Sequence, residues 1–101
     1  MTQLVHVVLV DWADEAPADV AAEASALVDR HLRPLPGIVS LDAGGSVSGE
    51  GLESGFEWAL VIRFADEQAL ADYLPHPEHQ VVGSFLQEHS ARLVVFDLAS
   101  A

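Results

Sequence analysis

The sequence predicts a single α+β domain over residues 1–101, with the ferredoxin-like βαββαβ arrangement and a broken second helix. Three observations support this prediction. The length of 101 residues suits one hydrophobic core. Strand-like and helix-like segments follow one another in that order along the chain. Hydrophobic residues make up 50% of the sequence, a high share that indicates strands covered on both faces or a buried oligomer interface.

The first strand is expected over residues 4–10, which are rich in β-branched side chains. Both of its faces are apolar, so both should be covered by other parts of the assembly. Alternation divides the residues into one face with Leu4, His6, Val8 and Val10 and another with Val5, Val7 and Leu9.

The first helix should open at the acidic segment 14–17, because acids and a proline favour a helix N-terminus. Apolar residues then recur at helical spacing as far as His31. Pro34 and Pro36 prevent the helix from continuing, and residues 38–43 form a plausible second strand.

The segment 44–55 contains five glycines and should connect two strands. A phosphate-binding loop is the alternative, but the segment has neither a lysine nor the P-loop spacing. The clearest strand follows over 56–64. One of its faces carries the bulky side chains Phe56, Trp58, Leu60, Ile62 and Phe64.

The second helix is expected in two pieces, because Pro75 and Pro77 interrupt it. The first piece is capped by Asp66 and runs over 67–74, and the second runs over 77–90, followed by a last strand over 93–98. Two helices cover only one face of a four-stranded sheet. We therefore expect a homodimer through the open sheet face, which carries Val5, Val7, Leu9, Ala59 and Val61.

Charge and composition exclude several classes of partner. Acidic residues outnumber basic ones 16 to 4, and the net charge is −12, so we expect binding neither to nucleic acid nor to an anionic membrane. The absence of cysteine rules out disulfides and thiol catalysis. Because the first residues do not resemble a secretory signal and no apolar run approaches ~20 residues, we expect a cytoplasmic protein.

Polar residues cluster in the segment 73–79, Tyr-Leu-Pro-His-Pro-Glu-His, which joins the two helical pieces. His76 precedes Pro77 and should be the N-cap of the second piece, which puts His79 in its first turn. A neutral imidazole there can act as a general base. The hydroxyl of Tyr73 can donate a hydrogen bond to a carbonyl that becomes an enolate.

Each of these residues also has an ordinary structural explanation. His6, in an apolar strand, could be a hydrogen-bonded core residue, and Tyr73 could simply cap the core. His76 could serve only as a helix cap. His76 and His79 lie three residues apart and could form half of a metal site, but the motif is incomplete, so we expect no metal.

In these residues the chain resembles the stress-responsive dimeric α/β-barrel (Dabb) domain family. The segment 73–79 resembles its Tyr-x-x-His-Pro-x-His signature. Weaker likenesses cover 5–9 (the opening strand), 45–51 (a loop with glycine and serine) and 55–64 (the third strand). The resemblance extends from about Leu4 to Leu98 and implies a ferredoxin-like subunit in a homodimeric α/β barrel.

Members of the olivetolic acid cyclase type supply expectations for individual residues. That resemblance implies His79 as the general base and Tyr73 as the group that holds the substrate carbonyl, with His6 lining the pocket. This chain departs from that type, because Trp58 stands where a further pocket histidine would be and Val5 where a lysine would be. We include Trp58 and His76 among the expected substrate-binding residues.

Two functions of different classes remain open. In the first, the homodimer binds a small apolar or carbonyl metabolite between the sheet and the helices without acting on it. In the second, the protein is a polyketide cyclase or isomerase that needs no cofactor, with His79 and Tyr73 as catalytic residues. A cofactor-free monooxygenase on the same fold is a related third possibility.

Overall fold

The structure, a computed structural model, describes residues 2–100. Its elements are β1 (Gln3–Trp12), α1 (Val20–Leu27), η1 (Val28–Leu32), β2 (Ile38–Gly45), β3 (Trp58–Phe64), α2 (Glu67–Tyr73), α3 (Pro77–His89) and β4 (Ser90–Ser100). This is the predicted ferredoxin-like order, with the second helix broken into α2 and α3.

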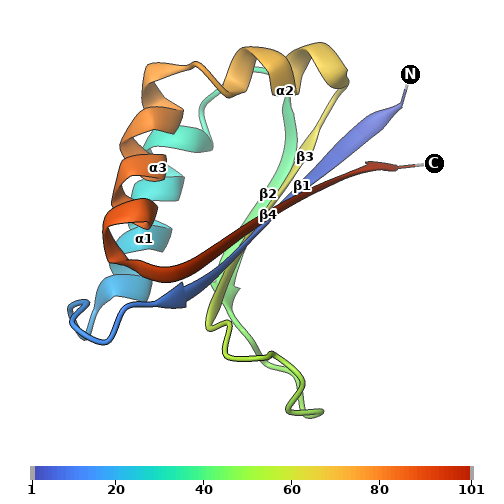
Figure 1. The fold of residues 1–101 in the computed structure, drawn as a ribbon. Helices are drawn as coiled ribbons and strands as arrows, with labels where there is room; N and C mark the ends of the chain where they lie inside the picture. Colours follow the sequence, from blue (N-terminus) through green and yellow to red (C-terminus); the bar gives the residue numbers. More distant parts are fainter. Residues whose placement is uncertain (1, 101) are drawn as a thin grey trace.

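The four strands form one antiparallel sheet in the order β2-β3-β1-β4. All helices lie on one side of this sheet, and the β2–β3 loop projects beyond its end (Figure 1). The hydrophobic core lies between the two layers, where Val10, Ile62 and Phe64 are fully buried. The two edge strands are β2 and β4, so the long last strand has one unpaired side.

Local sequence explains the break between α2 and α3. Asp66 is the N-cap of α2, and its side chain accepts a hydrogen bond from the Ala69 amide at 2.9 Å. His76 is the N-cap of α3, as predicted, and Pro77 follows at the first helical position. The chain therefore stops and restarts a helix within a few residues.

Several predicted boundaries were wrong. The first helix begins at Val20 rather than near Pro17, because residues 14–19 form turns before it, and it ends in the π-helical turn η1. β3 begins at Trp58 instead of 56. β4 begins at Ser90, directly after α3, instead of at 93.

The sheet face away from the helices is apolar. It carries exposed side chains from β4, including Phe96, which is 62% exposed, and Leu98, beside Val5 and Val7 of β1. No helix in residues 2–100 is long and apolar enough to cross a membrane.

Candidate functional site

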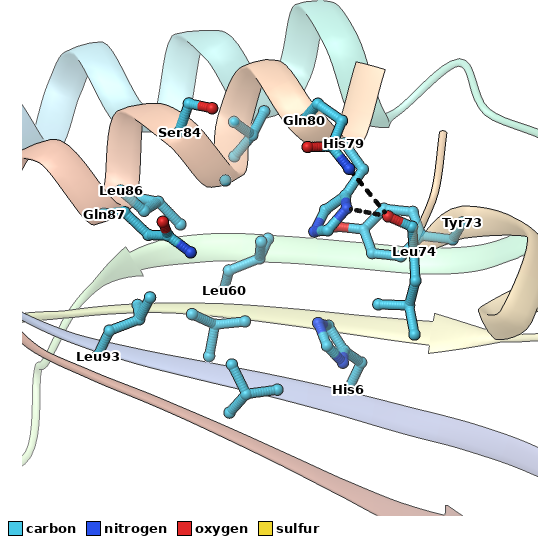
Figure 2. Close-up of a pocket in the computed structure, with 14 residues that line it drawn as sticks. His6, Leu60, Tyr73, Leu74, His79, Gln80, Ser84, Leu86, Gln87 and Leu93 are labelled. Atoms are coloured by element: carbon cyan, nitrogen blue, oxygen red, sulfur yellow. Dashed lines mark hydrogen bonds between the residues drawn. The ribbon is translucent and has the colours of Figure 1, made fainter. Parts of the chain in front are cut away.

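A cavity of about 340 Å³ lies between the helices and the sheet. Its walls come from α2 and α3 above and from β1, β3 and β4 below (Figure 2). Three polar aromatic side chains, His6, Tyr73 and His79, line it, and aliphatic side chains such as Leu60, Leu86 and Leu93 form much of the rest. The structure thus brings together three of the residues that the sequence analysis selected.

The His79 imidazole is held in one orientation by the backbone. Its Nδ1 lies 2.8 Å from the carbonyl oxygen of Leu74, where the chain passes from α2 to α3. A carbonyl oxygen only accepts hydrogen bonds, so Nδ1 must carry the proton. In the neutral ring, Nε2 then has a free lone pair and can accept a proton.

Gly83 leaves the space beside that nitrogen open. It lies one helical turn after His79 and also lines the cavity. A methyl group added at Gly83 would lie 3.8 Å from Nε2 of His79, which is ordinary contact distance. The missing side chain therefore provides room for a ligand atom near Nε2.

Tyr73 is the last residue of α2 and is only 5% exposed. The centroid of its ring lies 4.4 Å from that of His79 and 5.8 Å from that of His6. Its hydroxyl forms no hydrogen bond with any other residue of the part of the chain that the structure describes. Burial raises the pKa of Tyr73 above its ordinary value, so the phenol remains a hydrogen-bond donor.

His6 reaches the cavity from the floor of the sheet, as Figure 2 shows. It is the buried polar residue of β1, and its Nδ1 lies 2.5 Å from Oδ1 of Asp97 on β4. The two residues are direct cross-strand partners. The Asp97 carboxylate accepts a hydrogen bond from the Nδ1–H group of His6 and so orients the ring.

Sequence analysis missed Asp97 because it did not predict which strands are neighbours. A signal was nevertheless present. Asp97 interrupts the apolar run of the last strand as His6 interrupts that of the first. Two polar residues in otherwise apolar strands are candidates for a buried pair, since buried polar groups normally find partners.

The other two expected substrate-binding residues lie outside this cavity. Trp58 is 2% exposed, packs against Trp12 and donates from Nε1 to the Ser25 hydroxyl of α1 at 3.1 Å. His76 uses Nδ1 to accept the Glu78 amide hydrogen at 3.1 Å, as an N-cap does. Neither side chain belongs to the lining of the cavity.

Several polar side chains near the α2–α3 junction are engaged in local hydrogen bonds. Nδ1 of His76 and of His79 both bond to the backbone, and the Glu78 carboxylate lies 2.9 Å from Nδ1 of His31 in η1. Within residues 2–100 there is no group of three or more His, Asp or Glu side chains placed to hold a metal ion.

Comparison with known proteins agrees with this architecture. The model of the stress responsive A/B barrel domain family matches residues 4–100. A dimeric ferredoxin-like protein of unknown function from a Jannaschia species is 28% identical, with a TM-score of 0.84 and coverage of 95% of this chain and 97% of that one. No curated protein matches the sequence.

Two further structures share the fold at lower identity. A dimeric ferredoxin-like protein of unknown function from Thermobifida fusca is 20% identical, with a TM-score of 0.85 and coverage of 98% of this chain and 92% of that one. The hydroxynitrile lyase of Passiflora edulis is 13% identical, with a TM-score of 0.86 and coverage of 98% of this chain and 94% of that one.

Proposed function

The chain belongs to the stress responsive A/B barrel domain family, and from this we propose that it is a homodimer that binds a small carbonyl compound and moves a proton on it without a cofactor. The observation that carries the proposal is the bond between Nδ1 of His79 and the Leu74 carbonyl. That bond leaves Nε2 as a base facing a cavity large enough for a small molecule.

In the proposed reaction, Nε2 of His79 removes a proton from the carbon next to the ligand carbonyl. The electron pair moves onto the carbonyl oxygen, and the Tyr73 hydroxyl donates a hydrogen bond to that oxygen as it becomes negative. The enolate then takes the proton from His79 at an atom other than the carbon that lost it, or its carbon attacks a second carbonyl of the same molecule, whose oxygen takes the proton from His79. The first outcome is an isomerisation and the second a cyclisation by intramolecular aldol attack.

The proposed homodimer uses the open face of the sheet. Apolar side chains of β4 are exposed there in a single subunit and those of β1 and β3 are partly exposed, and a second copy would remove them from water. The Jannaschia and Thermobifida fusca proteins, which share the fold, are both described as dimeric. The cavity lies on the opposite face, so dimerisation leaves it within each subunit.

A second candidate is a protein that binds the carbonyl compound without changing it. The bond between His79 and Leu74 also favours this function, because it ties α2 to the first turn of α3 and has a structural role of its own. The fold can serve an enzyme, since one neighbour is a hydroxynitrile lyase, but 13% identity supports the fold alone.

One substitution separates the two candidates. His79→Asn keeps an N–H donor for the Leu74 carbonyl and removes the base. The measurement is the exchange of α-protons for deuterium in simple β-diketones, followed by NMR. We expect wild-type protein to accelerate the exchange and His79→Asn to reduce the acceleration ~10²–10⁴-fold, with the free energy of unfolding nearly unchanged.

His76→Asn is the matched control, because it lies in the same junction and asparagine also caps a helix well. It should exchange protons as wild type does. Equal exchange by His79→Asn and wild type would reject the catalytic function. Binding of the diketone without any accelerated exchange would support the second candidate.

A further inference from the structure

We propose that the cavity selects uncharged carbonyl compounds and excludes those that carry a carboxylate or a phosphate. This inference rests on the proposed function and adds the class of ligand. The first observation is the composition of the lining, which includes neither lysine nor arginine. Sites that bind anionic ligands generally use these cations for direct hydrogen bonds.

The four arginines are placed elsewhere. Arg33 bonds to Asp29 at 2.7 Å, and Arg92 bonds to Asp11 at 2.9 Å. Arg63 lies 3.4 Å from the side-chain oxygen of Gln3, and Arg30 belongs to η1. With no lysine in the chain, no long cationic side chain lines the cavity to neutralise an anion.

A carboxylate lies near the polar end of the cavity instead, because Asp97 bonds to the lining residue His6. An anionic ligand would approach this like charge as well as a chain of net charge −12. Like charges brought together at a binding site oppose association.

The N-terminus of α3 is the one feature that would favour an anion, because helix dipoles place positive charge there. Local groups already compensate for it. Pro77 has no amide hydrogen, the Glu78 amide donates to His76, and Glu78 itself adds a negative charge to the turn. The polar end therefore offers a donor to a neutral carbonyl, from Tyr73, without a positive site for an anion.

Much of the remaining lining suits a hydrocarbon body. Val8, Leu60, Leu86, Leu93 and Val95 line the cavity, and Figure 2 shows Leu86 and Leu93, with the uncharged amide of Gln87, at the end away from His6 and Tyr73. Val95 remains 54% exposed, so an apolar ligand would remove its side chain from water. An uncharged ligand with its carbonyl at Tyr73 and its hydrocarbon part along these residues satisfies both ends.

The test compares two ligands of equal length, a β-diketone with an alkyl chain and the same molecule with a carboxylate at the end of that chain. Dissociation constants are measured at about pH 8 by NMR titration of the histidine ring signals. We expect the neutral compound to bind at least about 10-fold more tightly. Equal binding, or tighter binding of the carboxylate, would overturn the inference while leaving the proposed function intact.

Two variants with the same change in net charge sharpen the test. Val95→Arg adds a cation to the cavity wall and should tighten binding of the carboxylate about 5–10-fold. Val81→Arg adds one to the exposed surface of α3, outside the lining, and should leave the preference unchanged. An equal effect of both variants would show that net charge rather than the lining decides. If neither ligand binds to wild type, the proposed function fails together with the inference.

Discussion

The two faces of the sheet differ most clearly at two adjacent residues of β4. Phe96 points to the open face and is 62% exposed, whereas Asp97 points to the helix side and bonds to His6 beside the cavity. The alternation of a strand is enough to give neighbouring residues different roles. One strand therefore presents an apolar surface on one face of the sheet and orients a histidine of the candidate site on the other.

The largest expected effect is on association. Phe96→Asp should dissociate the proposed homodimer, because each copy loses about 1.5–3 kcal/mol of apolar burial and gains a charge at the interface. The dissociation constant should rise at least about 100-fold, as measured by analytical ultracentrifugation. The cavity should still bind its ligand, because it lies on the other face. A variant that remains dimeric would place the interface elsewhere.

The next largest effect is on stability and concerns the face of the sheet that the helices cover. Asp97→Ala leaves Nδ1 of the buried His6 without its partner and should lower the free energy of unfolding by about 1–3 kcal/mol, measured by chemical denaturation. Asp97→Asn is the control, because its side-chain oxygen can still accept from Nδ1. If the two variants were equally stable, the hydrogen bond would contribute little. Neither variant should change the dimer.

A smaller effect is expected at Gly83, where one substitution should raise stability and lower ligand affinity. Gly83→Ala should stabilise α3 by about 0.5–1 kcal/mol, because alanine favours a helix interior and no atom lies closer than 3.8 Å to the added methyl group. The same methyl group fills the space beside Nε2 of His79, so ligand affinity should fall about 10-fold. Thermal unfolding and ligand titration together test this. Unchanged affinity would mean that the ligand does not approach Nε2 from this side.

The smallest effect is the response of Tyr73 to alkali. Burial raises the pKa of Tyr73 in the folded chain, so the unfolded chain releases this proton first and stability should fall as the pH rises above about 10. Half a pH unit above that onset, the free energy of unfolding should have fallen by less than about 1 kcal/mol. Tyr73 is the only tyrosine, so its ultraviolet titration reports on this residue alone. Titration near the ordinary value would show that the phenol is exposed to water.

The comparison of faces also explains what the sequence could predict. Alternation assigned His6 to the helix side of β1 and Val5 and Val7 to the other side, and prolines located the break between α2 and α3. These features depend on residues close together in the chain. The element order followed from them, and the family match and the structure confirm the ferredoxin-like fold.

What sequence could not supply depends on contacts between distant segments. The pairing of His6 with Asp97 requires the strand order, and the burial of Trp58 against Ser25 requires the position of α1 over the sheet. The periodicity of the sequence predicts neither of these contacts. The sequence did identify His76 as an N-cap from Pro77, but it could not show that the Leu74 carbonyl would orient the His79 ring or that only His79 would line the cavity. The roles of Tyr73 and His79 remain predictions.

The adjacency of β1 and β4 has a consequence for the folding of this domain. His6 and Asp97 are 91 residues apart in the sequence but lie opposite each other on neighbouring strands. A chain that has formed the helices and paired β1 with β3 still lacks the carboxylate of Asp97 beside His6 until β4 joins the sheet. The candidate site is thus completed only by the pairing of β4, and a chain without β4 would retain His6, Tyr73 and His79 without the strand that completes the sheet.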